Sequence, residues 1–171
     1  VKVPYILSEP VERGIYESRV LPNLTTHVAP HAVRIASAWG VLTRLFRPRG
    51  DAYVEPLSEI APSLTAFEKM HLYAQGRVPD RLGQEEATAL IGELPGLRSE
   101  FDQEVMYEGA VGASPREVKY VLDRAAQAEA DSCLTPMGVL REIAELAERA
   151  KDFPFLGLES EQGGYHDQVQ F

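Results

Sequence analysis

The sequence of 171 residues lacks several features that would assign it to a simple class of protein. Cys133 is the only cysteine, which excludes a disulfide framework and a thiolate metal site and favours a reducing compartment. No stretch approaches the ~20 apolar residues that a membrane-spanning helix needs. Basic residues number 17 against 26 acidic ones, and the net charge of −9 disfavours nucleic acid and anionic membranes as partners. We therefore expect a cytoplasmic chain that binds neither.

Motifs of a complete nucleotide site or metal site are also missing. The chain has no GxxxxGK[ST] phosphate loop and none of the Gly-rich, HRD or DFG motifs of a conventional protein kinase. Its four histidines form no HExxH arrangement, so no metal ligands are expected. The chain starts at Val1 without a methionine or a signal peptide, and we expect it to be a piece of a longer protein.

The charge is distributed unevenly along the chain. Residues 1–50 hold seven basic and three acidic residues, a net charge of +4, which leaves −13 for the remainder. The simplest interpretation of the acidic excess after Asp51 is solvated helix surface.

Apolar residues recur at helical spacing along most of the chain, which predicts an all-α fold. Residues 32–46 form the most apolar of these segments, and Trp39 lies on its buried stripe. Residues 1–7 alternate in the manner of a short strand. Further helices are expected at residues 65–74, 87–94, 97–105, 114–126 and 135–147, and Pro95-Gly96 should end the second of these.

Two capping boxes mark helix starts. Thr65 and Glu68 form the first, ahead of a helix whose residues Phe67, Met70 and Ala74 would face the core. Ser114 and Glu117 form the second, with Pro115 at the favoured first helical position.

Arg116 lies in this second capping box. At ~100° per residue it falls about 160° around the helix from Val118, so it should point away from the core. Helix N-termini attract anions, and Gly109 and Gly112 would let a phosphate or another chain approach closely. On spacing alone, a well-capped helix in which Arg116 pairs with a nearby acid is the commoner arrangement.

The segment Gly112-Ala113-Ser114-Pro115-Arg116 resembles the sensor-2 motif of MoxR-type AAA+ ATPases, whose arginine reaches from a helical lid to the phosphates of the nucleotide. The wider pattern is similar to the C-terminal region of the PrkA family, AAA+-type serine protein kinases, almost from end to end. The segments that carry this resemblance are Ala29–His31, Trp39–Leu45, Glu68–Ala74, Tyr107–Gly109, Gly112–Arg116 and Gly163–Asp167.

The resemblance implies a division of the chain and a pair of cofactors. Residues 1–8 would end the core strand, residues 9–131 would form the helical lid with an insertion at about 47–108, and residues 132–171 would form a C-terminal extension. The phosphate loop and the acids that bind Mg²⁺ would precede Val1, so ATP and Mg²⁺ are cofactors of the longer protein.

The resemblance also implies a site. Arg116 would bind nucleotide phosphate, with Ser114 and Arg44 as further candidates, although Arg44 could equally form a salt bridge across the bundle. No catalytic residue is expected in this chain. The segment Tyr165-His166-Asp167 could position a peptide or a phosphate, or could simply form a turn.

The function that follows is the lid and C-terminal region of an ATP-dependent serine protein kinase, inactive when isolated. Its expected partners are the ATPase core of the same protein, a protein substrate and, as in many AAA+ rings, further copies of itself. Two alternatives stay open: an AAA+ motor that remodels or helps to degrade proteins, and a helical protein-docking module.

Overall fold

The computed structural model describes residues 2–128, 133–149 and 164–165. In these residues it contains eight α-helices, two short 3-10 helices (η) and two strands of two residues each, so the all-α prediction is confirmed. The elements in chain order are α1 (Glu9–Arg19), η1 (Leu21–Asn23), β1 (His27–Val28), α2 (Ala32–Leu42), η2 (Gly50–Ala52), α3 (Leu57–Ser63), α4 (Ala66–Gln75), α5 (Gln84–Gly92), α6 (Leu94–Ser99), α7 (Pro115–Ala128), β2 (Cys133–Leu134) and α8 (Pro136–Glu148).

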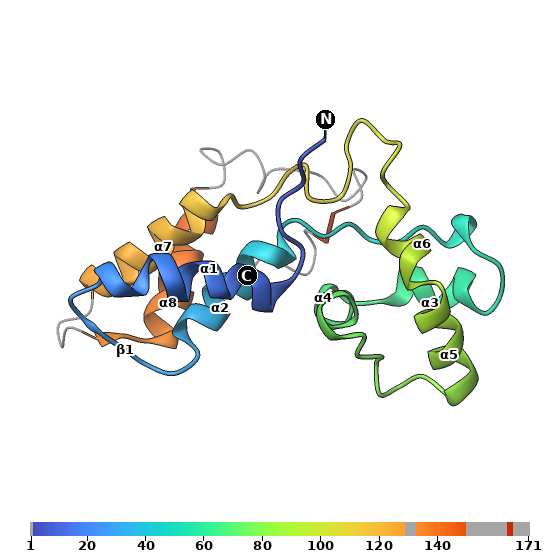
Figure 1. Cartoon of the computed structure of the whole chain (residues 1–171), viewed down its shortest axis with the longest axis horizontal. Helices are drawn as coiled ribbons and strands as arrows, with labels where there is room; N and C mark the ends of the chain where they lie inside the picture. The colour runs from blue at the N-terminus through green and yellow to red at the C-terminus, as the bar shows by residue number, and fades with distance from the viewer. Residues whose placement is uncertain (1, 129–132, 150–163, 166–171) are drawn as a thin grey trace.

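The helices form two groups that lie side by side (Figure 1). The first lobe, as we call it, consists of α1, α2, α7 and α8 with the parallel pair β1 and β2. The second lobe consists of α3, α4, α5 and α6. Because the second lobe lies between α2 and α7 in the sequence, the first lobe is assembled from two separate stretches of chain.

Helix α2 contributes to the core of both lobes. Its first two turns place Ala36 and Trp39 in the core of the first lobe, where Trp39 is 4% exposed, as predicted. Its last turn places Val41 and Leu42 in the core of the second lobe. An apolar surface that extends around a helix buries it on several sides, so α2 is the central element of the fold.

The helix starts follow from local capping, as the sequence predicted. The Glu68 N–H donates to Thr65 Oγ1 (3.2 Å), and the Thr65 N–H donates to the Glu68 carboxylate (2.8 Å). At the start of α8, Thr135 Oγ1 accepts from the Gly138 N–H (3.0 Å). Gly76, at φ +65°, ends α4 in the left-handed conformation that glycine adopts at little cost.

Three predictions about local structure were wrong. Residues 2–7 form no strand; instead the Tyr5 N–H donates to the Gly109 carbonyl (2.8 Å), and Lys2 Nζ bonds the Asp102 and Glu104 carbonyls. The helix expected at 97–105 is α6, which starts and ends earlier. Pro95-Gly96 lies inside α6, because proline is tolerated in the first turn of a helix.

Phe67 was also assigned wrongly to the core. Its side chain is 56% exposed, whereas Met70 is buried and Lys69, two residues along α4 from Phe67, is fully buried. The face of α4 that packs inward therefore includes a charge, which an apolar pattern does not predict.

No helix in the described part of the chain is both long enough and apolar enough to cross a membrane. The second lobe falls inside the insertion expected at about 47–108, but the domain boundaries themselves stay predictions.

Candidate functional site

Arg116 is the second residue of α7, and its side chain is exposed. It makes no ion pair or hydrogen bond to any residue that the structure describes. The predicted capping box is present beneath it: the Ser114 N–H donates to Glu117 Oε2 (2.5 Å), and the Glu117 N–H approaches Ser114 Oγ (3.4 Å). The acid of this turn is thus occupied with the backbone, and the guanidinium of Arg116 is left free.

The turn before α7 is attached to the end of α2 through Ala113. Its N–H donates to Thr43 Oγ1 (2.8 Å), and its carbonyl accepts from Arg44 Nε (2.9 Å) and Nη2 (2.7 Å). The Thr43 hydroxyl in turn donates to the Gly40 carbonyl (2.8 Å). Both backbone groups of Ala113 are therefore satisfied by two consecutive residues of another segment, which fixes the position from which Arg116 projects.

The glycines of this turn are needed for close contact within the chain. Gly112 has φ +120°, and a Cβ there would lie 2.8 Å from the Thr43 carbonyl oxygen and 2.5 Å from Arg44 Cγ. Gly109 has φ +81° and lies against Pro4 and Tyr5 in the same way. The space beside these glycines, which we expected a phosphate or another chain to approach, is occupied by residues of this chain.

Arg44 is fully buried. Besides the Ala113 carbonyl, its guanidinium donates to the Ile6 carbonyl (2.8 Å) and to Glu12 Oε1 (2.8 Å), and it lies over the Tyr5 ring. The structure thus favours the salt-bridge alternative for Arg44, and a contact with nucleotide stays a prediction. Tyr16 donates a hydrogen bond to the same Glu12 oxygen. Burial, and then Glu12, raise the pKa of Tyr16, so its hydroxyl stays protonated as a donor.

A second buried ion pair, between Lys69 and Glu108, lies beside Phe46, two residues after Arg44. Lys69 Nζ donates to Glu108 Oε1 (2.5 Å) and to the Phe46 carbonyl (2.6 Å), while the Phe46 N–H donates to Glu108 Oε1 (2.7 Å). Burial raises the pKa of Tyr73, with Glu108 adding to the shift, and its hydroxyl is within 3.1 Å of Glu108 Oε2. Sequence analysis missed this pair, because residues 39 positions apart give no local signal.

Only Tyr165 of the segment Tyr165-His166-Asp167 lies within the described residues. It is buried in the core of the second lobe, and the Arg47 guanidinium lies 5.1 Å from its ring. The preceding Gly164 forms an isolated bridge with Phe46. A packing role for Tyr165 follows, and His166 and Asp167 lie outside the described residues.

The chemistry available around Arg116 is anion binding. A planar guanidinium at the positive end of a helix suits phosphate oxygens. Among the residues that the structure covers, no group of three or more His, Cys, Asp or Glu side chains could hold a metal ion. The arrangement offers a positive charge held at a fixed position on the surface.

We compared the sequence with models of protein families, with proteins of curated function and with solved structures. The family described as the PrkA serine protein kinase C-terminal domain matches residues 67–170, which include α4 to α8 and the turn at Arg116. No protein of curated function and no solved structure matches the chain.

Proposed function

Because the chain belongs to the PrkA serine protein kinase C-terminal domain family, we propose that it is the nucleotide-responsive lid of an ATP-dependent serine protein kinase. ATP and Mg²⁺ would be bound by an AAA+ core outside this chain, and Arg116 would contact the phosphates from the lid. Phosphoryl transfer depends on positioning and on neutralising charge, and Arg116 supplies the second of these.

One observation carries this proposal. Arg116 is an exposed arginine, without a partner among the described residues, at a helix N-terminus whose own capping groups are already satisfied. If the motif served only to cap α7, the arginine would add nothing to it. A free guanidinium held at a fixed point is what phosphate recognition needs.

The contacts beneath Arg116 also support a response to nucleotide. Ala113 is bonded to Thr43 and Arg44, and Arg44 is bonded to Glu12 on α1 and to Ile6. A displacement of the turn at Arg116 would therefore be resisted by α1, α2 and residues 5–6 together. Ligand-driven movement requires contacts that differ between two states, and this network supplies contacts that a movement would have to change.

The proposal is tested in the full-length protein with Arg116→Ala. We expect the affinity for ATP to fall about tenfold or more, as when one partner of a charge-assisted contact is removed. Lys119→Ala is the matched control, since it removes another cation from α7, one that pairs with Asp123 of the same helix. Binding of a fluorescent ATP analogue and transfer of labelled phosphate to protein serine are the two measurements.

The outcomes separate the proposal from its alternatives. Unchanged ATP affinity and turnover in Arg116→Ala would contradict the phosphate contact and favour a helical docking module. ATP turnover without phosphate transfer to any protein would contradict the kinase and favour an AAA+ motor.

A further inference from the structure

A cavity of about 320 Å³ lies between the two lobes, and Arg116 is not among the residues that line it. Glu9 of α1 lines it, as do Arg34, Ile35 and Ala38 of α2 and Phe67 and Met70 of α4. The size is that of a small ligand-binding site. Because its walls come from both lobes, a molecule bound there would contact both.

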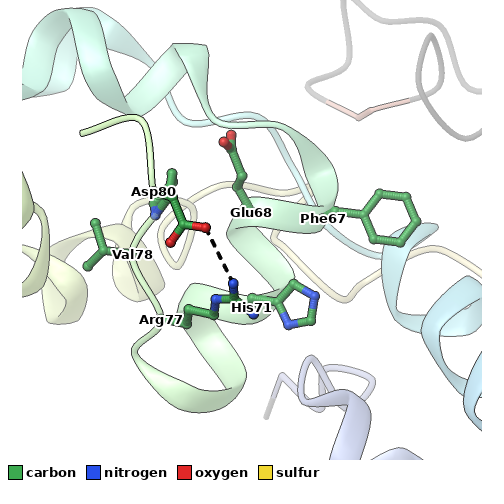
Figure 2. Close-up of a pocket in the computed structure, with 7 residues that line it drawn as sticks. Phe67, Glu68, His71, Arg77, Val78 and Asp80 are labelled. Carbon is green, nitrogen blue, oxygen red and sulfur yellow. Dashed lines mark ion pairs between the residues drawn. The ribbon is translucent and has the colours of Figure 1, made fainter.

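A second cavity, of about 290 Å³, adjoins the first along α4 and shares Phe67 and His71 with it. Figure 2 shows the rings of Phe67 and His71 projecting from one side of α4, away from Val78 and Asp80. Arg77 and Asp80, at this second cavity, pair with each other at 3.6 Å. We call these two neighbouring cavities the groove, and a ligand that occupied both would have to be extended, as a peptide can be.

Glu9 gives the first cavity a buried negative charge. It is only 6% exposed, and its Oε1 is shielded from solvent and accepts no hydrogen bond within the described structure. The nearest cation is Arg13 Nε at 3.5 Å, which also lies 3.7 Å from Glu17. Charge–charge attraction is stronger where water is excluded, so the buried Glu9 carboxylate would attract a cationic group that entered the cavity, without a direct bond to the shielded Oε1.

The rim of this cavity carries charge of the opposite sign. Arg34 and His31 are exposed there, His71 is half-buried, and none of the three has a partner among the described side chains. A ligand made only of positive charges would be repelled by Arg34. A basic group with an acidic neighbour fits both the interior and the rim.

We propose that this groove binds an extended segment of the protein substrate, with a lysine or arginine side chain directed at Glu9 and an acidic residue beside Arg34. The apolar walls formed by Ile35, Ala38 and Met70 would cover the aliphatic stem of the basic side chain. The identity of the bound protein as the substrate rests on the proposed kinase function. The binding of a peptide to the groove does not depend on that function.

The test measures the binding of two fluorescein-labelled peptides to the full-length protein by anisotropy. The two peptides differ only at the central residue, which is lysine in the first and glutamine in the second. In both, leucines precede this residue and a glutamate follows it. We expect the lysine peptide to bind at least about tenfold more tightly, and Glu9→Gln to remove that preference.

Two variants control for indirect effects. Glu17→Gln removes the other carboxylate beside Arg13 but lines neither cavity, and it should keep the lysine preference. Ala38→Leu adds volume to the cavity wall and keeps the Glu9 carboxylate, and it should weaken the lysine peptide about tenfold. If Glu9→Gln fails to fold, as judged by circular dichroism, Ala38→Leu still decides the outcome.

Equal binding of the two peptides, or an unchanged preference in a folded Glu9→Gln, would overturn the proposal. Free lysine that binds as tightly as the peptide would also overturn it, since the groove would then serve a small molecule. Arg116→Ala should bind the lysine peptide normally, so failure of the nucleotide proposal and failure of this one show up separately.

Discussion

Each lobe has a buried ion pair at its boundary with the other lobe: Arg44 with Glu12 in the first lobe, and Lys69 with Glu108 in the second. Arg44 bonds Glu12, Ile6 and Ala113 at once, because a planar guanidinium presents several donors in a fixed fork. Lys69 is a compact charge that bonds Glu108 and one carbonyl. The hydrogen bonds of Arg44 therefore connect α1, residue 6 and the turn that carries Arg116. Those of Lys69 hold Glu108 and Phe46 against α4.

The largest effect is expected for Arg44→Met, which leaves the Glu12 charge unpaired and removes donors from two backbone carbonyls. Removing one partner of a buried ion pair typically costs about 3–5 kcal/mol in the free energy of unfolding, and we expect the upper end of this range. Urea denaturation measures the loss. Glu12→Gln added to Arg44→Met should recover part of it, and a loss below about 1 kcal/mol would show that the pair contributes little.

Lys69→Met should destabilise the protein less, by about 3 kcal/mol, because fewer partners lose a donor. Amide hydrogen exchange should become faster in α4 and near Phe46, while α7 keeps its protection. Equal acceleration in both lobes would contradict the view that this pair acts locally.

Thr43→Val tests whether the attachment of the turn before α7 matters for ATP binding as well as for stability. It removes the acceptor for the buried Ala113 N–H, at a cost of about 1–3 kcal/mol. In the full-length protein it should also weaken ATP binding, since the turn that carries Arg116 loses one of its attachments. Thr43→Ser keeps the hydroxyl and should restore ATP affinity, and a Thr43→Val protein with normal affinity would separate this turn from nucleotide binding.

The smallest effect concerns Glu68 at the surface of the second lobe. Burial raises its pKa, but hydrogen bonds from Arg81 and from the Thr65 backbone outweigh this and place the pKa below its ordinary value of 4.5. A carboxyl with a lowered pKa in the folded state stabilises the protein above that ordinary value and loses the effect as the pH falls through the folded pKa.

Glu68→Gln should therefore cost less than about 1 kcal/mol at neutral pH and nothing in acid. Denaturation at several pH values measures the difference from the unaltered protein. A difference that persists below the pKa would mean that packing, and not charge, carries the effect.

Local features of the fold were predictable from the sequence, and long-range ones were not. Thr65 and Ser114 were recognised as caps because both partners of each box lie within three residues. The exposure of Arg116 also followed from helix geometry. Helix α3 was missed, since it has only seven residues and contains Pro62.

The buried charges show where sequence reasoning fails. Neither Lys69 nor Glu108 was recognised as buried, because charged side chains are rarely buried unless they are paired. Their pairing depends on two segments that meet only in the folded chain. Phe67 was placed inside for the opposite reason, since a pattern of apolar residues does not say which of them a neighbouring lobe will cover.

The placement of the second lobe between α2 and α7 has a consequence for synthesis on the ribosome. Helices α1 and α2 emerge first, and Trp39 must wait for α7 and α8 before the core of the first lobe can close. The helices of the second lobe have all emerged by Ser99, before α7, and Tyr165 joins their core last. Because domains tend to fold in the order in which they emerge, the inserted lobe should be the first to become protease-resistant in a series of chains of increasing length.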